Sequence, residues 1–95
     1  MGEIKNTNVL LFQTKKMKRQ IKLIWDFRGE TALKTAEHHL IHLKEYLQIE
    51  KLPINITGFE SINAFHAIAF IVTTDEYMIQ LRDTLKPHRG ELYES

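Results

Sequence analysis

One stretch, residues 30–51 (ETALKTAEHHLIHLKEYLQIEK), has the length and periodicity of a single long helix. Apolar side chains recur in it at steps of three and four, which places them along one stripe of a helix: Leu33, Ala36, Leu40, Leu43 and Leu47. Pro53 follows and ends the helix, because proline lacks the backbone N–H that a continuing helix needs. At about 1.5 Å per residue the helix is roughly 30 Å long, enough to cross one face of a small sheet.

Three further segments have the composition and spacing of β-strands. Residues 21–28 (IKLIWDFR) alternate, which predicts a strand with one side against the helix. Residues 54–60 (INITGFE) predict a second strand, and residues 61–64 predict a turn. Residues 65–73 (FHAIAFIVT) are apolar on both sides, which is typical of a central strand whose two faces are both covered.

A second helix and a short strand complete the chain. Thr73 and Glu76 have the spacing of a capping box, which predicts a helix from about Asp75 to the residue before Pro87. Residues 91–93 predict a short final strand. The order strand, helix, strand, strand, helix, strand predicts an α+β protein, the ferredoxin-like sandwich (βαββαβ). We expect an antiparallel sheet in the strand order 4-1-3-2, with both helices on one face.

The sheet face that the helices leave open is expected to be apolar. We place Ile24 on it, together with one side of the central strand: Phe65, Ala67, Ala69 and Ile71. An exposed apolar patch of this kind usually marks an interface. The sequence therefore predicts a homodimer that forms through the open sheet face.

The composition excludes several classes of protein. The 95 residues contain no cysteine, which excludes disulfides and thiolate chemistry and fits a reducing cytoplasm. The chain has no apolar run of the ~18 residues that a transmembrane helix needs, and no apolar core of a secretory signal. It has no P-loop and no dinucleotide-binding fingerprint either. We expect a cytoplasmic protein with no membrane contact and no cofactor.

Basic residues are concentrated at the N-terminus. Residues 1–20 hold five of the 13 Lys and Arg residues but one of the 12 Asp and Glu residues. We therefore predict a basic, flexible arm over residues 1–19 and a single α+β domain over residues 20–95. DNA binding needs several Lys or Arg on one surface, which the mildly acidic domain does not offer. A nucleic-acid binder that uses the basic arm ranks last among our hypotheses.

The side of the long helix opposite the leucine stripe carries few of the charges that a solvated surface normally has. At about 100° per residue it holds Thr35, His38, His42, Tyr46 and Ile49, with His39 close by. His38 and His42 stand one turn apart, a spacing with which two imidazoles can chelate a metal ion. A zinc site needs at least one more ligand. We favour the alternative, a ligand-binding or contact surface made by His38, His39, His42 and Tyr46.

Three titratable residues fall on or beside the predicted central strands. Asp26 and Arg28 are two residues apart in the first strand and therefore share one face of the sheet. His66 opens the central strand, where it is either a hydrogen-bonded core residue or a general acid or base in a pocket. Asp26 and Arg28 either form an ordinary ion pair or, in a closed dimer cavity, Arg28 holds an anionic ligand bidentately.

A compact cationic turn follows the second helix at residues 86–90 (KPHRG). One interpretation is a helix stop, whose cations lie near the negative end of the helix dipole. The other is that His88 and Arg89 contact an anion or a carboxylate. The sequence leaves both interpretations open.

Together these features resemble a family of small bacterial proteins. The layout is similar to the stand-alone ferredoxin-like proteins that pair into dimeric α+β barrels, including the YciI-like group. As in that group, a histidine-bearing helix follows the first strand, here with His38, His39 and His42. The resemblance covers residues 20–95 and rests on architecture, and the acidic catalytic-type residue late in the group's chain has no clear counterpart. It implies a dimer with a cavity near the sheet and specifies no reaction.

Two functions from different classes fit these expectations. The first is a cytoplasmic homodimer that binds a small ligand or a protein partner without a reaction. The second is a small dimeric-barrel enzyme, in which His66 or the helix histidines do acid–base work and Arg28 orients an anionic substrate. A closed cavity that both His66 and Arg28 reach would favour the enzyme.

Overall fold

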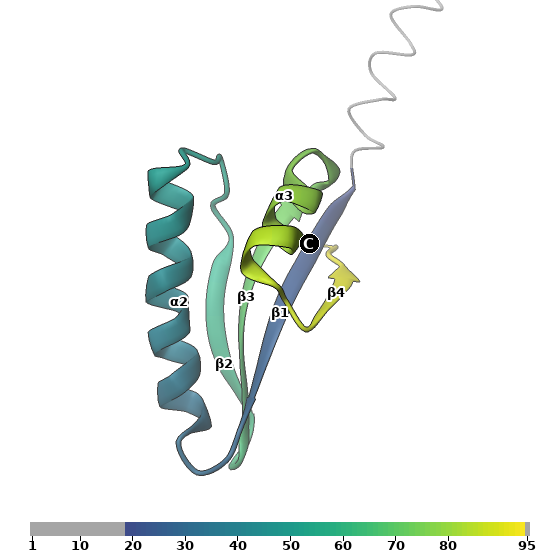
Figure 1. Ribbon diagram of the computed structural model, residues 1–95. Helices are drawn as coiled ribbons and strands as arrows, with labels where there is room; N and C mark the ends of the chain where they lie inside the picture. Colours follow the sequence, from purple (N-terminus) through teal and green to yellow (C-terminus); the bar gives the residue numbers. More distant parts are fainter. Residues whose placement is uncertain (1–18, 95) are drawn as a thin grey trace, which may run out of the picture.

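The structure is a computed structural model that describes residues 19–94. Within it, strand, helix, strand, strand, helix and strand follow one another (Figure 1). Their bounds are β1 Gln20–Arg28, α2 Ala32–Ile49, β2 Thr57–Asn63, β3 His66–Thr74, α3 Asp75–Leu85 and β4 Arg89–Leu92. The basic arm predicted over residues 1–19 lies outside the described residues, except for Arg19.

The four strands form one antiparallel sheet in the order β2-β3-β1-β4. This is the predicted order 4-1-3-2, read from the other edge. Figure 1 shows the long helix α2 running along the sheet, with the shorter α3 beside it over β1 and β3. The predicted α+β class, with an antiparallel sheet and two helices, is therefore confirmed.

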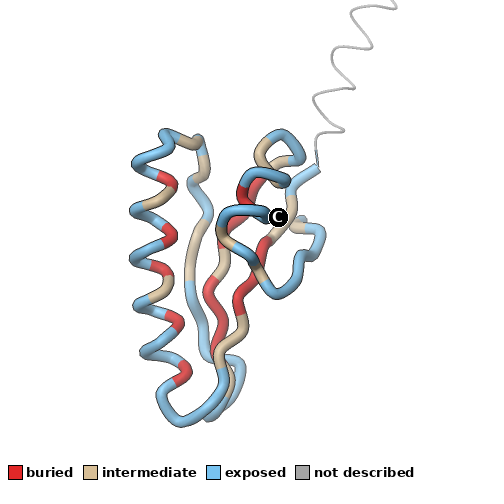
Figure 2. Tube along the Cα trace, in the orientation of Figure 1, coloured by how far each residue is buried: buried red, intermediate tan, exposed pale blue. Residues whose placement is uncertain are grey.

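Both helices pack on the same face of the sheet. The core between them is apolar and contains Leu23, Trp25, Ala32, Ala36, Leu43, Leu47, Ala67, Ala69, Ile71 and Leu81. Figure 2 shows the buried positions as a line down the sheet-facing side of α2 and along the central strands. We call this side of the sheet the helix face and the opposite side the open face.

Strand β3 has its two sides the opposite way round from the prediction. The side expected to be open belongs instead to the helix-face core: Ala67, Ala69 and Ile71. Partners in an antiparallel pair point to the same face, and Ala69 lies opposite the core residue Trp25. Phe65 precedes the strand and lies in the hairpin. The error has a physical cause: in a strand that is apolar on both sides, alternation does not show which side meets the helices.

The open face carries both charged and apolar side chains. It presents Lys22, Ile24, Asp26 and Arg28 of β1 and His66, Ile68, Phe70 and Val72 of β3. Ile24 and Ile68 are only 1% and 3% exposed, although both helices pack on the other face. Ile24 therefore lies on the predicted face, but the apolar patch that motivated the predicted dimer does not.

Three further details differ from the prediction. Helix α2 presents Ala32 to the core, whereas Leu33 lies one step round the helix and is 46% exposed. Strand β2 extends to Asn63, because the Asn63 side chain accepts the N–H of Phe65 at 2.8 Å and closes a tight hairpin. Helix α3 begins at Asp75 as expected, but its N-cap is Thr74, and the Thr73 hydroxyl donates to the carbonyl oxygen of Thr74 at 3.1 Å instead of closing the predicted capping box.

A glycine makes the turn from β1 into α2. Gly29 has a φ of +116°, a conformation that side-chain-bearing residues rarely adopt. Its N–H donates to the carbonyl oxygen of Phe65 at 2.9 Å. This contact fixes the end of β1 beside the start of β3, where Arg28 lies opposite His66.

Candidate functional site

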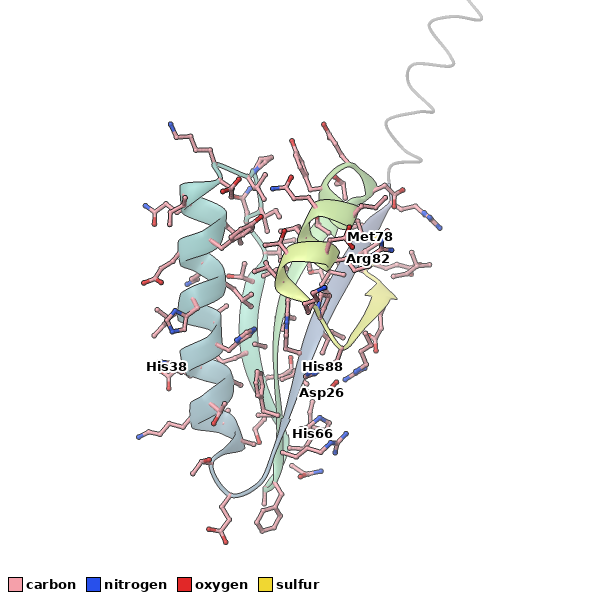
Figure 3. The ribbon with its side chains drawn as sticks, viewed as in Figure 1. Asp26, His38, His66, Met78, Arg82 and His88 are labelled. Atoms are coloured by element: carbon pink, nitrogen blue, oxygen red, sulfur yellow. The ribbon has the colours of Figure 1, made fainter. Side chains whose placement is uncertain are left out.

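A polar cluster on the open face is centred on Asp26. His66 Nε2 lies 2.7 Å from Asp26 Oδ1, and the two side chains are only 13% and 15% exposed. Because an ionised carboxylate only accepts hydrogen bonds, His66 Nε2 carries the proton and donates it. His66 Nδ1 makes no hydrogen bond within residues 19–94. Figure 3 shows Asp26 and His66 on the same part of the sheet, with His88 close by.

Arg89, the first residue of β4, binds the same carboxylate with two nitrogens. Arg89 Nε donates to Asp26 Oδ2 at 2.9 Å, and Nη2 donates to Oδ1 at 3.1 Å. Arg89 Nη1 donates to Glu91 Oε2 at 2.7 Å. The β1–β4 register makes this possible, because it places Arg89 opposite Ile24 on the open face. The cationic turn does end the helix, because α3 stops at Leu85 and Lys86 is its left-handed C-cap, and Arg89 in addition contacts a carboxylate of the chain itself.

Arg28 is on the same face but does not pair with Asp26. Its side chain is exposed, it lies opposite His66 in the register, and it has no ion pair within residues 19–94. The Asp26 carboxylate is already engaged from the β4 side. The guanidinium of Arg28 is therefore the cation beside His66 that remains able to bind an external anion.

Hydrogen bonds keep Asp26 ionised. The hydrogen bonds from Arg89 hold the pKa of this carboxyl well below its usual value of 3.8, and the hydrogen bond from His66 lowers it further. Burial acts in the opposite direction and is outweighed. The same hydrogen bond from Arg89 to Asp26 raises the pKa of the guanidinium. At neutral pH the cluster therefore holds a carboxylate and a guanidinium, with the imidazole of His66 beside them.

His88 fixes the backbone of Asp26. Its Nδ1 accepts the Asp26 N–H at 2.7 Å, and its own N–H donates to the carbonyl oxygen of Ile24 at 2.9 Å. The imidazole thus continues the β1–β4 ladder where the backbone of β4 has ended. Because Nδ1 accepts a hydrogen bond, the proton of the neutral ring is on Nε2. The predicted pair His88 and Arg89 therefore holds Asp26 from both backbone and side chain.

A second group on the open face involves Lys22, which the sequence analysis missed. The Lys22 ammonium lies 4.3 Å from the centroid of the Phe70 ring, a cation–π geometry. The ring lies against Gly58, where an added Cβ would be 2.8 Å from it. A glycine inside the second predicted strand was the available signal, because it marks a close approach by another group.

His39 lies on the helix face and is packed among aromatic rings. Its ring centroid is 5.3 Å from the centroid of Trp25 and 5.3 Å from that of Phe27. His39 Nε2 is buried without a hydrogen-bond partner. Burial lowers the pKa of this imidazole below 6.5, and the charges of His42 and His88 lower it further. His39 is therefore a neutral packing residue at neutral pH.

His38 and His42 point outward from α2, and Figure 3 shows His38 on the side away from the sheet. Their ring centroids are 5.0 Å apart, and His42 Nδ1 lies 3.3 Å from Glu45 Oε1. Among residues 19–94, no group of three or more His, Asp or Glu side chains is arranged to hold a metal ion. The pair is thus an exposed surface feature of the helix.

Tyr46 does not belong to the same surface. It is half-buried against the core, and its hydroxyl accepts a hydrogen bond from Gln80 Nε2 at 3.2 Å. The four residues predicted to form one contact surface are therefore divided: His38 and His42 are exposed, whereas His39 and Tyr46 are packed between the helices and the sheet.

Comparison of the chain with protein-family models, with curated proteins and with solved structures gives no match. Neither helix within residues 19–94 is long and apolar enough to cross a membrane.

Proposed function

We propose that this chain is a cytoplasmic module of the ferredoxin-like type that forms a homodimer through its open sheet face and binds a small anionic ligand there. One observation carries the proposal. The Asp26 carboxylate is held by His66 at 2.7 Å and by two nitrogens of Arg89, on a sheet face opposite both helices. Titratable groups whose pKa is shifted by specific charged partners, as that of Asp26 is, cluster at functional sites.

The side-chain groups of the cluster that are not engaged within residues 19–94 indicate the kind of ligand. Asp26 is fully engaged, whereas Arg28 has no ion pair within residues 19–94 and His66 Nδ1 has no hydrogen bond there. A guanidinium beside an imidazole suits a small anion, because the guanidinium offers two parallel donors to a carboxylate or phosphate. The ligand would lie over Arg28 and His66, at the end of the sheet nearest the β2–β3 hairpin.

The architecture supports the dimer. The element order and strand order are those expected of ferredoxin-like proteins. In the dimeric α+β barrels, which this layout resembles, a second sheet covers the corresponding face, and we infer the same arrangement here. Two such faces brought together would enclose both polar clusters, the one at Asp26 and the one at Lys22 and Phe70. Enclosure excludes water and strengthens each electrostatic contact.

A second candidate function is acid–base catalysis by His66. The hydrogen bond to Asp26 fixes the ring orientation and puts the proton on Nε2, which leaves Nδ1 as the basic nitrogen. A carboxylate that orients an imidazole in this way is a recurring arrangement in enzymes. In this candidate, Arg28 orients an anionic substrate whose proton Nδ1 removes.

Light scattering on the full-length protein tests the dimer. We expect a mass of twice the 11.2 kDa chain for the wild type. Phe70→Glu places a negative charge in the proposed interface on the open face and should give a monomer. Within that monomer, Lys22 can pair with the new carboxylate. Phe59→Glu is the matched control, because Phe59 lies opposite Ala69 on the helix face of the neighbouring strand. A monomeric wild type at high concentration would show that this proposal is wrong.

The ligand is tested in the same samples with inorganic phosphate. Phosphate should shift the NMR signals of the His66 imidazole in the wild type and should do so much less in Arg28→Gln. If both proteins respond alike, Arg28 does not hold the anion. If neither responds in a protein that is dimeric, the dimer stands and the anion site is rejected.

A further inference from the structure

A groove lies on the helix face, between α3 and β4. Its volume is about 470 Å³, within the range of about 300–1,000 Å³ that is common for small-molecule sites. Its apolar walls are formed by Ile21, Leu23, Met78, Pro87 and Leu92. Figure 3 shows Met78 and Arg82 next to each other on α3, on its side toward β1 and β4. The groove is thus on the opposite face of the sheet from the Asp26 carboxylate and His66.

Gly90 keeps the groove open. It lies opposite Leu23 in the β1–β4 register, so a side chain at this position would point toward the helix face. A Cβ there would lie 3.6 Å from Ile21 Cγ2 and 3.6 Å from Leu23 Cδ2, which is ordinary van der Waals contact. A larger side chain would therefore be tolerated by the backbone but would occupy the groove. Glycine inside a strand often marks the close approach of a ligand.

The polar groups that line the groove are mostly donors. They are Arg19, Arg82 and His88, because the side chains of Arg89 and Glu91 lie on the open face, opposite Ile24 and Lys22. On that face Arg89 pairs with Glu91 at 2.7 Å and with Asp26 at 2.9 Å. The remaining donors have no acceptor in the lining, and the neutral His88 ring carries its proton on Nε2, because Nδ1 accepts the Asp26 N–H. The lining therefore has an excess of positive charge and of hydrogen-bond donors.

The two arginines that remain are only lightly engaged. Arg19 Nε is 3.5 Å from Asp75, and Arg82 Nε is 3.2 Å from Asp83, with all four side chains about half exposed or more. Exposed pairs of this kind contribute about 0–1 kcal/mol each. Their terminal nitrogens are available to an anion that enters the groove. Apolar walls with cationic ends complement a molecule that is apolar along its length and negative at one end.

We propose that this groove binds a small amphipathic carboxylate, an apolar chain that ends in one carboxylate group. The apolar chain lies over Gly90, between Met78 and the apolar side chains of β1 and β4. The carboxylate is bound by the guanidinium of Arg82 and by the Nε2–H of His88. The ligand is a free small molecule, because the groove is recessed between α3 and β4 and its size matches one short chain.

Calorimetric titration of the full-length protein with decanoate, below its micelle concentration, tests the proposal. We expect one decanoate per chain and weaker binding of decanol. Gly90→Val should abolish binding, because a β-branched side chain suits a strand and fills the groove. Arg82→Gln should weaken binding about fivefold, as expected for an exposed ion pair. Lys44→Gln removes one positive charge from an exposed position of α2 and should leave decanoate binding unchanged.

Several outcomes would overturn the proposal. Equal affinities for decanol and decanoate would show that the carboxylate group does not contribute to binding. Loss of decanoate binding in Arg28→Gln but not in Arg82→Gln would show that decanoate binds on the open face and not in the groove. A change of the light-scattering mass in Gly90→Val would show that the groove is occupied by a second copy of the chain. Shifts of the NMR amide signals of residues 9–12 in Gly90→Val would show that the groove is occupied by the chain's own N-terminal segment.

A second variant keeps the test valid if Gly90→Val does not fold. Leu92→Gln replaces an apolar wall at a position that is 62% exposed, where a polar side chain is tolerated. It should weaken decanoate binding and leave the melting temperature within a few degrees of the wild type. Unchanged decanoate binding in this variant would also reject the groove as the site.

Discussion

The two faces of the sheet each border one half-buried histidine, and the two imidazoles have opposite surroundings. On the open face, His66 Nε2–H donates a hydrogen bond to Asp26 Oδ1 at 2.7 Å. On the helix face, His39 Nε2 is buried without a partner, and the ring packs against Trp25 and Phe27. The same side chain is an organised hydrogen-bond donor on one face and an apolar filler on the other.

This difference indicates which face of the sheet can stabilise a charged group. A buried polar atom without a partner costs about 1–3 kcal/mol, and a charge at such a place costs more. The helix face therefore tolerates His39 in its neutral form. The open face satisfies an ionised carboxylate through cross-strand partners, so it can hold charge without that cost. We expect ligand chemistry to depend on the His66 side and acid sensitivity near neutral pH to depend on the His39 side.

Asp26→Asn is expected to have the largest effect, because the contacts of His66 and Arg89 converge on this carboxylate. We expect a loss of about 2 kcal/mol in the free energy of unfolding at pH 7, since charged hydrogen bonds contribute about 1.5–3 kcal/mol each. The 42% exposure of the Arg89 side chain keeps the loss below that of a fully buried pair. Urea unfolding measures it. Wild-type stability in Asp26→Asn would mean that the cluster does not stabilise the fold.

The pH dependence of the same variant identifies the cause. The pKa of Asp26 is lowered in the folded chain, so its contribution is present above the usual value of 3.8 and is lost as the pH falls below it. Asp26→Asn should therefore lose less stability than the wild type below pH 4. Asp83→Asn is the control, because Asp83 is exposed and pairs with its neighbour Arg82. It should keep the wild-type acid response.

His39→Leu is expected to have the next largest effect, with the opposite sign. Leucine removes the unpartnered nitrogen and keeps an apolar side chain against Trp25 and Phe27, so the protein should gain about 1 kcal/mol at pH 7. The pKa of His39 is lowered from 6.5 by burial first and then by His42 and His88. As the pH falls below 6.5, the unfolded wild type takes up a proton that the folded chain resists, and stability is lost.

The variant should remove that loss below pH 6.5, again measured by urea unfolding. His38→Leu is the matched control on the same helix, because His38 is exposed. It should change the stability by less than about 0.5 kcal/mol, the usual limit for surface substitutions, and keep the pH response. A less stable His39→Leu would show that the imidazole has a polar partner after all.

The fold could be predicted because its signals are local. A helix that buries one side leaves a repeat of three and four residues, and residues 30–51 show it clearly. A strand with one buried side alternates, and residues 21–28 do so, which placed Asp26 and Arg28 on the same face. Strand β3 lacks that contrast. Its two apolar sides could be assigned only through its register with β1.

The candidate site could be predicted only in part, because its central contacts join distant segments. Asp26 and Arg89 are 63 positions apart, and their contact depends on how β4 pairs with β1. Nothing local to residues 86–90 specifies that pairing. His38 and His39 are neighbours in the sequence, and only the placement of α2 on the sheet decides that one ring is exposed and the other packed.

The smallest expected effect is that of zinc, which concerns a third environment for histidine. His38 and His42 have neither a buried partner nor an apolar pocket, and their ring centroids are 5.0 Å apart. Two imidazoles leave a zinc ion short of the four ligands that it prefers in structural sites. At a zinc concentration equal to the Kd the stabilisation is only about 0.4 kcal/mol, or roughly 2–3 °C in a domain of this size.

We therefore expect 0.1 mM zinc to raise the melting temperature by less than about 3 °C, as measured by circular dichroism in a buffer that does not chelate. His42→Ala should abolish any shift, because it removes one of the two imidazoles. His88→Ala should not matter. A shift above about 10 °C that disappears in His42→Ala would indicate a further ligand beside this pair. The outer side of α2 would then be a candidate functional site as well. The contrast between the two sheet faces would no longer be enough to identify where the function lies.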